Sequence, residues 1–274
     1  MDIRNIAIIA HVDHGKTTLV DKLLRSSHTF RDNQVVEERV MDSNALEKER
    51  GITILAKNTA ITYKNTKINI LDTPGHADFS GEVERIMKMV DGVVLVVDAY
   101  EGTMPQTRFV LKKAFEEHLK PIVVINKVDK PSARPLEVID EVLELFIDLG
   151  CDVEELDFPV CYASAVNNTC SLSSDLATQT NGMEPLLDMI IKYIPAPNMD
   201  KEAPLQLQPA LLDYTDFVGR IGIGRIARGT IHTGEVVSCC RVDGSIKSFR
   251  VQKLYGFLGL DRIEIKEASA GEIV

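Results

Sequence analysis

A loop between an apolar run and a helical segment is the first stretch that could do chemistry. It reads Ala10-His11-Val12-Asp13-His14-Gly15-Lys16-Thr17-Thr18, and it follows the apolar run Ile6-Ala7-Ile8-Ile9. A strand, a loop and a helix in this order are typical of a phosphate-binding loop, in which backbone N–H groups and the helix dipole bind anionic oxygens. An ordinary strand-to-helix turn is the alternative, because Ala10 stands where the pattern prefers glycine. The residues expected to bind the nucleotide here are Asp13, His14, Gly15, Lys16, Thr17 and Thr18.

Three side chains of this loop have separate expected roles. Lys16 would reach the β- and γ-phosphates and neutralise charge during the reaction, and the Thr17 hydroxyl would ligate Mg²⁺. Asp13 is electrostatically unfavourable beside phosphates. We therefore expect Lys16 or a monovalent cation to compensate its charge.

The segment Asp72-Thr73-Pro74-Gly75-His76 follows a second apolar run. The Asp72 carboxylate could hold Mg²⁺ through water, and the Gly75 amide could bond the γ-phosphate, although a simple Pro-Gly turn is the bland alternative. His76 could orient an attacking water, or it could be a histidine on a solvated helix start. Upstream, Thr53 is a candidate to contact Mg²⁺ with its hydroxyl and the γ-phosphate with its backbone, although a threonine that opens a strand is often structural.

The segment Asn126-Lys127-Val128-Asp129 points to guanine. The Asp129 carboxylate could accept from the N1–H and the 2-amino group of guanine, two donors that adenine lacks, while the stem of Lys127 could lie across the base. After the next strand, Ser164-Ala165 could supply a backbone N–H for the guanine oxygen. Together with Asn126, these residues predict a guanine-binding site.

Strand and helix patterns alternate over the first part of the chain and predict an α/β domain with a mostly parallel sheet covered by helices. Ligands then bind at the carboxyl ends of the strands, where each motif falls. We expect a phosphate-binding-loop domain over residues 1–198, with a loop at 167–182, and an incomplete antiparallel β-barrel over 199–274. The segments expected to form strands in the second region are Leu205–Asp213, Arg220–Ala227, Glu235–Val242, Ile246–Leu254 and Arg262–Lys266.

Composition limits the classes of function. The chain has 274 residues and a formal net charge of −10. Residues 200–274 hold ten basic and ten acidic side chains, so residues 1–199 carry the whole excess of negative charge. Such a domain is not a non-specific nucleic-acid binder by electrostatics. An N-terminus without a signal segment, the absence of a long apolar run, and five cysteines without paired spacing predict a cytoplasmic protein with reduced thiols.

The motifs together, including His11-Val12-Asp13-His14-Gly15-Lys16-Thr17-Thr18, resemble the translational GTPases, the superfamily of elongation factor G. The segments 79–85, 101–108 and 208–212 resemble the BipA/TypA family of ribosome-associated GTPases most. The resemblance implies a bacterial protein whose C-terminal domains are missing here. It also implies that His76 is the catalytic residue, ordered on the ribosome.

These observations predict a Mg²⁺-dependent GTPase that hydrolyses GTP to GDP and phosphate, with His76, Lys16 and Thr53 as its catalytic residues. Its Mg²⁺ site would consist of Thr17, Thr53 and Asp72. We expect a monomer that acts on the ribosome in translation, ribosome assembly or stress adaptation, largely through domains missing from this chain, and that binds neither DNA nor membranes. Two alternatives stay open: a nucleotide-gated binding module that does not hydrolyse GTP, and a regulatory GTPase with a protein activator.

Overall fold

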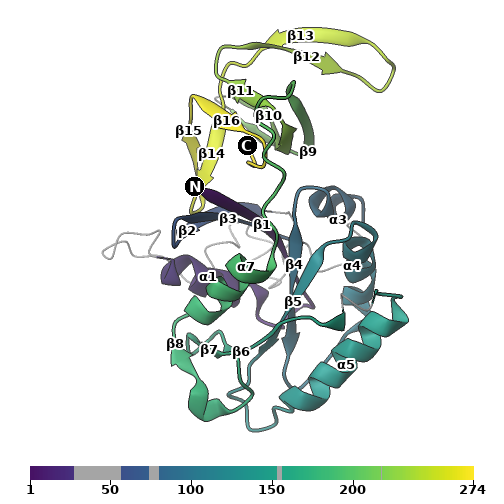
Figure 1. The fold of residues 1–274 in the computed structure, drawn as a ribbon, viewed down its shortest axis with the longest axis vertical. Coiled ribbons are helices and arrows are strands. Elements are labelled where there is room, and N and C mark those ends of the chain that lie inside the picture. The colour runs from purple at the N-terminus through teal and green to yellow at the C-terminus, as the bar shows by residue number, and fades with distance from the viewer. Residues whose placement is uncertain (28–56, 74–79, 153–155, 217) are drawn as a thin grey trace. The chain divides into compact units, whose positions relative to one another are not determined.

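The computed structural model describes residues 1–27, 57–73, 80–152, 156–216 and 218–274. The chain divides into two compact units, Met1–Ala196 and Pro197–Val274, and each is described by itself. The first unit is an α/β domain and the second consists of antiparallel strand pairs (Figure 1). The expected fold class is therefore confirmed.

The described part of the first unit is centred on a sheet of eight strands, in the order β2-β3-β1-β4-β5-β6-β7-β8. Neighbouring strands from β3 to β6 run parallel, while β2, β7 and β8 pair antiparallel with their neighbours. All seven residues of β4 are buried, as expected of a strand covered on both faces. The bounds are β1 (Asp2–Ala10), β2 (Lys57–Tyr63), β3 (Thr66–Asp72), β4 (Gly92–Asp98), β5 (Lys120–Asn126), β6 (Val160–Ser164), β7 (Thr169–Ser171) and β8 (Thr180–Asn181).

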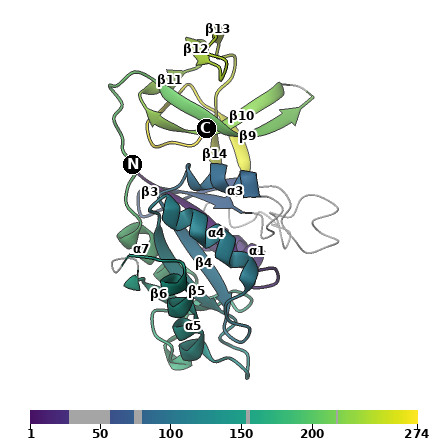
Figure 2. The same cartoon turned by 90° about the vertical axis from the view of Figure 1, so that its right-hand side faces the viewer.

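Helices cover both faces of this sheet. Helices α1 and α7 lie on one face, and α3, α4 and α5 lie on the other (Figures 1 and 2). Helices α4 and α5 each begin with a proline, whose missing N–H costs nothing at a helix start. The bounds are α1 (Lys16–Ser26), α3 (Ser80–Met87), α4 (Pro105–Glu116), α5 (Pro135–Asp148) and α7 (Glu184–Tyr193).

The strand order explains where a ligand can bind. Strand β1 pairs with β3 on one side and with β4 on the other, so the chain reverses its direction of progress through the sheet beside β1. In open α/β sheets, ligands bind at such a point, outside the carboxyl ends of the strands. The loop that follows Ala10 lies there.

The expectation of a loop at residues 167–182 is wrong in part. This segment contains β7, a short 3₁₀ helix (Leu176–Thr178) and β8, which extend the sheet past β6. The polar sequence conceals these short strands because Cys170 and Ser171 alone in β7 are buried, too few to produce a visible alternation. Pairing with β6 stabilises β7, and pairing with β7 stabilises β8.

Within its described residues, the second unit contains four strand pairs: β9 with β10, β11 with β16, β12 with β13, and β14 with β15. A small core of Ile226, Ile231, Val251, Leu254, Ala268 and Val274 lies among them. The expected strand Ile246–Leu254 is shorter in the structure, because β13 ends at Arg250 and a new strand begins at Tyr255. The bounds are β9 (Gln206–Thr215), β10 (Gly219–Arg228), β11 (Thr230–His232), β12 (Val236–Cys240), β13 (Ile246–Arg250), β14 (Tyr255–Leu258), β15 (Asp261–Glu264) and β16 (Glu267–Ser269).

A helix that spans a membrane must be both long and apolar. Among the residues that the structure describes, no helix meets these two requirements.

Candidate nucleotide-binding site

The loop after β1 turns into α1 at Gly15, which precedes the first helical residue and has a φ of 92°. This left-handed backbone favours glycine. A Cβ on Gly15 would also lie 2.4 Å from Nδ2 of Asn126, so the site has no room for a side chain. Within the described residues, no side chain caps the helix, and an uncapped helix N-terminus is favourable for binding an anion.

Lys16 is buried at the start of α1, and its Nζ lies 2.9 Å from Oδ1 of Asp72 at the end of β3. It also donates to the carbonyl of Thr73, whose hydroxyl donates to the carbonyl of Ile8 at 2.6 Å. These contacts join the loop to the ends of β1 and β3. They also pair the lysine with a carboxylate that is fully buried.

The residues expected to hold Mg²⁺ fit the ion by their chemistry. Mg²⁺ prefers carboxylate and hydroxyl oxygens, and the buried carboxylate of Asp72 ends β3 while the half-buried Thr17 lies in the first turn of α1. Thr18 is likewise half-buried there. The described part of the Mg²⁺ set therefore consists of hard oxygen donors at one edge of the sheet.

Asn126, at the end of β5, forms hydrogen bonds with two other segments of the chain. Its Nδ2 donates to the carbonyl of His14 at 2.8 Å, and its Oδ1 accepts from the backbone N–H of Ala165 at 3.0 Å. The side chain is almost fully buried, so both bonds form away from water. Asn126 therefore holds the loop after β1 and the loop after β6 at fixed positions relative to the end of β5.

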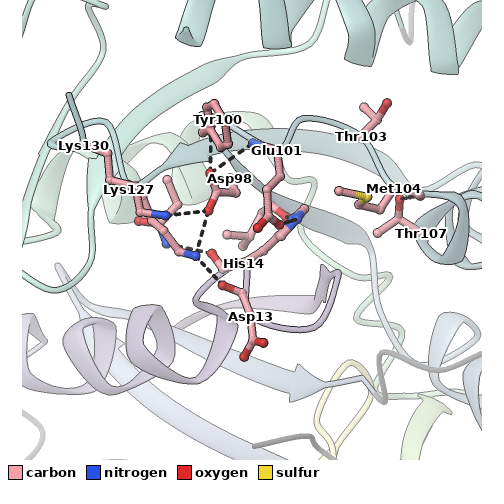
Figure 3. A network of polar contacts seen from close by, with 12 residues as sticks. Asp13, His14, Asp98, Tyr100, Glu101, Thr103, Met104, Thr107, Lys127 and Lys130 are labelled. Carbon is pink, nitrogen blue, oxygen red and sulfur yellow. Dashed lines mark hydrogen bonds and ion pairs between the residues drawn. The ribbon is translucent and has the colours of Figure 1, made fainter. Parts of the chain in front are cut away.

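Lys127 crosses from the end of β5 to the same loop. Its Nζ donates to the carbonyl of Asp13 and lies 2.7 Å from Oδ2 of Asp98. Figure 3 shows the carbonyl of Asp13 turned toward this lysine and the carboxylate turned away from it. The Asp13 carboxylate is exposed, and the structure pairs neither Lys16 nor Lys127 with it. Its compensation by a monovalent cation stays a prediction.

Asp98 ends β4 and is fully buried in the centre of this network (Figure 3). Its Oδ1 accepts from the backbone N–H groups of Tyr100 at 2.8 Å and Glu101 at 3.3 Å, and its Oδ2 lies 3.3 Å from Nζ of Lys130. Burial acts to raise the pKa of Asp98. The bonds from Lys127 and the two N–H groups outweigh that effect and lower the pKa to about 2, so this carboxylate is ionised at neutral pH.

His14 is a buried residue of this loop. Its Nδ1 lies 3.4 Å from the carbonyl of Val96, and its Nε2 lies 3.2 Å from a carboxylate oxygen of Glu101. Burial lowers the pKa of His14 below 6.5, and the nearby His11 adds to the effect, whereas Val96 and Glu101 oppose it. The imidazole is therefore neutral at physiological pH and ties the loop to the end of β4.

The residues expected to read guanine differ in exposure. Asp129 is exposed, so its carboxylate is accessible to a ligand, and Ser164 is buried at the end of β6. The backbone N–H of Ala165 donates to Oδ1 of Asn126, and its expected bond to a guanine oxygen stays a prediction. The next residue, Val166, is exposed.

Thr53, Gly75 and His76 lie outside the described residues, so the expected γ-phosphate contacts and the expected catalytic histidine stay predictions. Conversely, the sequence analysis did not single out Asp98, Glu101 or Lys130. The position of Asp98 could have identified it as a site residue, because it directly follows the apolar run Val93-Val94-Leu95-Val96-Val97. A carboxylate at the carboxyl end of a central parallel strand lies at the ligand edge of the sheet.

Comparison with known proteins identifies the family. Residues 1–196 match the family described as the elongation factor Tu GTP binding domain. The chain belongs to this family. The match covers the whole of the first unit, including β1, the loop that follows it and the Asn126–Asp129 segment.

The curated relatives confirm the expected resemblance to the BipA/TypA family. The chain is 68% identical over 273 residues to the large ribosomal subunit assembly factor BipA of Bacillus subtilis, covering 100% of this chain and 44% of that protein. It is 58% identical over 272 residues to BipA of Escherichia coli K12, covering 99% of this chain and 44% of that protein. The chain therefore spans less than half the length of these relatives.

Solved structures show the same fold. A protein from Thermus thermophilus superposes with a TM-score of 0.72 at 21% identity, over 99% of this chain and 52% of that one. The bacterial selenocysteine-specific elongation factor EF-Sec superposes with a TM-score of 0.71 at 27% identity, over 100% of this chain and 41% of that one.

Proposed function

We propose that this chain binds GTP and Mg²⁺, hydrolyses GTP to GDP and phosphate, and acts on the bacterial ribosome as part of a BipA-type protein. One observation supports the nucleotide site above the others. Asn126 and Lys127, from the guanine-type segment, donate to the carbonyls of His14 and Asp13, from the phosphate-binding loop. Two motifs more than one hundred residues apart thus meet at one edge of the sheet.

The described residues divide the work of binding and catalysis. The N–H groups at the start of α1 and the ammonium of Lys16 would bind the phosphates, with Gly15 allowing the close approach. Asp129 would accept from guanine, and a backbone N–H of the Ser164-Ala165 segment would donate to the guanine oxygen. A bound Mg²⁺ would neutralise phosphate charge, with Thr17 and Asp72 as its described ligands or water-mediated contacts.

Lys16 must change partner when the nucleotide binds. Its Nζ now lies 2.9 Å from Asp72. A triphosphate would draw this ammonium away from the carboxylate and leave Asp72 available to Mg²⁺ and its waters. The ion pair therefore keeps both charges compensated until the ligand and the metal arrive together.

The relatives support the proposed partner and location. The curated relatives are named as large ribosomal subunit assembly factors, and we propose the ribosome as the partner and the cytoplasm as the location of this chain. Two residues outside the described ranges complete the proposed mechanism: His76 would orient the attacking water and Thr53 would contact Mg²⁺.

The test measures GTP and ATP binding by this chain with and without Mg²⁺, then GTP hydrolysis with and without ribosomes. The full-length B. subtilis relative is assayed in parallel, because this chain spans 44% of it. We expect guanine selectivity and slow hydrolysis by the isolated chain. Ribosomes should stimulate hydrolysis, and this stimulation should depend on His76. If docking on the ribosome needs further domains, the stimulation appears only in the longer protein. Guanine binding with a hydrolysis rate unchanged in His76→Ala would favour the nucleotide-gated binding module. Equal affinity for ATP and GTP would refute the proposal.

A further inference from the structure

Asp98 lies outside the motifs that define the nucleotide site, yet it contacts one of them directly. Its side chain is fully buried at the end of β4, while its main partners come from the loop after β5 and from its own loop. Its two oxygens have separate tasks. Oδ1 accepts from the N–H groups of Tyr100 and Glu101, and Oδ2 faces the ammonium groups of Lys127 and Lys130.

The geometry at Lys127 shows what Asp98 can do. Nζ of Lys127 lies between two acceptors, Oδ2 of Asp98 at 2.7 Å and the carbonyl of Asp13. A free lysine populates many rotamers, and ordering it on ligand binding costs conformational entropy. Two fixed acceptors at its tip select one direction for the four-carbon stem before any ligand arrives. The stem therefore runs in a fixed line from the end of β5 to the phosphate-binding loop.

Lys130 does not provide the same connection. Its Nζ lies at 3.3 Å from Oδ2 of Asp98, and its side chain is 42% exposed against 21% for Lys127. The ion pair of Lys127 is shorter, less exposed and continued to the phosphate-binding loop. The effect of Asp98 on a ligand should therefore pass through Lys127.

We propose that Asp98 is a positioning residue of the guanine nucleotide site, which holds the stem of Lys127 against the base and thereby slows nucleotide dissociation. This inference rests on the proposed function, because it requires a guanine nucleotide in the site. Asp98 itself touches no ligand and takes no part in the chemistry at the γ-phosphate. It acts on binding, and equally for GTP and GDP, because both carry the same base.

Asp98→Asn is the informative variant. The amide keeps an oxygen for the N–H groups of Tyr100 and Glu101 but removes the negative charge that faces Lys127. We expect GDP to dissociate about tenfold faster, which is the low end of the effect of a lost hydrogen bond to a charged group. KM for GTP should rise by a similar factor while kcat stays close to that of the wild type, because only binding to the base changes. A purely structural role would not produce this split.

The experiment measures dissociation of a fluorescent GDP analogue by stopped flow from four proteins: wild type, Asp98→Asn, Lys127→Met, and the double variant. Lys127→Met keeps an apolar stem and removes the ammonium. If Asp98 acts through Lys127, the double variant dissociates no faster than Lys127→Met alone. Asp148→Asn is the matched control, because Asp148 is an exposed aspartate that pairs with Arg108 at 3.3 Å. If the amide variant folds poorly, Asp98→Ser repeats the test, because its shorter side chain still carries a hydroxyl oxygen that can accept from the N–H of Tyr100.

Two results would overturn the inference. One is a GDP dissociation rate in Asp98→Asn equal to that of the wild type. The other is an acceleration of the same size with and without the Lys127 ammonium, which would mean that Asp98 acts through its own loop. Failure of the wild type to bind any guanine nucleotide is a different outcome, because it refutes the proposed function itself.

Discussion

A methyl group added at Gly15 gives the sharpest test of the described site. The residue has a φ of 92°, and its Cβ would lie 2.4 Å from Nδ2 of Asn126. The left-handed backbone costs a residue other than glycine about 1–2 kcal/mol. The clash must also displace the Asn126 amide, which donates to the carbonyl of His14 at 2.8 Å, and a buried carbonyl left without its donor costs about 1–3 kcal/mol. Gly15→Ala should therefore lower the free energy of unfolding by about 2–5 kcal/mol.

Gly150→Ala is the matched control. Gly150 follows α5 with a φ of 76°, and nothing lies within 4 Å of its added Cβ. This variant carries the backbone strain without the clash, so it should lose only about 1–2 kcal/mol. The difference between the two variants isolates the contact between Gly15 and Asn126.

The assay is urea unfolding of the nucleotide-free protein, followed by circular dichroism in the helical band. The described helices all lie in the first unit, so the signal reports the unit that contains both glycines. In an Asn126→Ala background, Gly15→Ala should cost no more than Gly150→Ala, because the clashing amide is gone. Equal losses for the two glycine variants in the wild-type background would refute the reasoning.

Two further predictions concern buried charged and titratable groups of the same loop. His14 has a pKa lowered by burial, so as the pH falls below about 6.5 the unfolded chain takes up a proton that the folded protein resists. The contribution of His14 to the free energy of unfolding should therefore be fully present above that pH and be lost below it. The free energy should fall more steeply in the wild type than in His14→Gln. Parallel curves from urea unfolding at several pH values would contradict this. Lys16→Met removes the ion pair of the fully buried Asp72 and should destabilise the protein by about 3 kcal/mol, with most of the loss recovered in Lys16→Met/Asp72→Asn. An unchanged unfolding midpoint in the single variant would show that the pair contributes nothing.

Local patterns in the sequence determined most of the first unit. The buried run of β4 and the alternation of strands and helices predicted the parallel sheet, because side-chain burial on both faces leaves a continuous apolar sequence. The sequence also predicts the phosphate-binding loop and the Asn126–Asp129 segment from local patterns. Their chemistry depends on residue types at short spacing, which a sequence displays directly.

Only the tertiary structure decided how these segments use each other. Strands β7 and β8 were missed because a strand of two or three residues depends on its neighbour for stability and shows no period of its own. The N–H of Ala165 bonds to the side chain of Asn126 because the parallel pairing of β5 and β6 brings the ends of these strands side by side. Asp98 and Lys127 are paired because β4 and β5 are parallel neighbours in the sheet. The sequence determined which chemical groups are present at the ends of the strands, whereas the order of strands in the sheet decided which of those groups are close enough to bond.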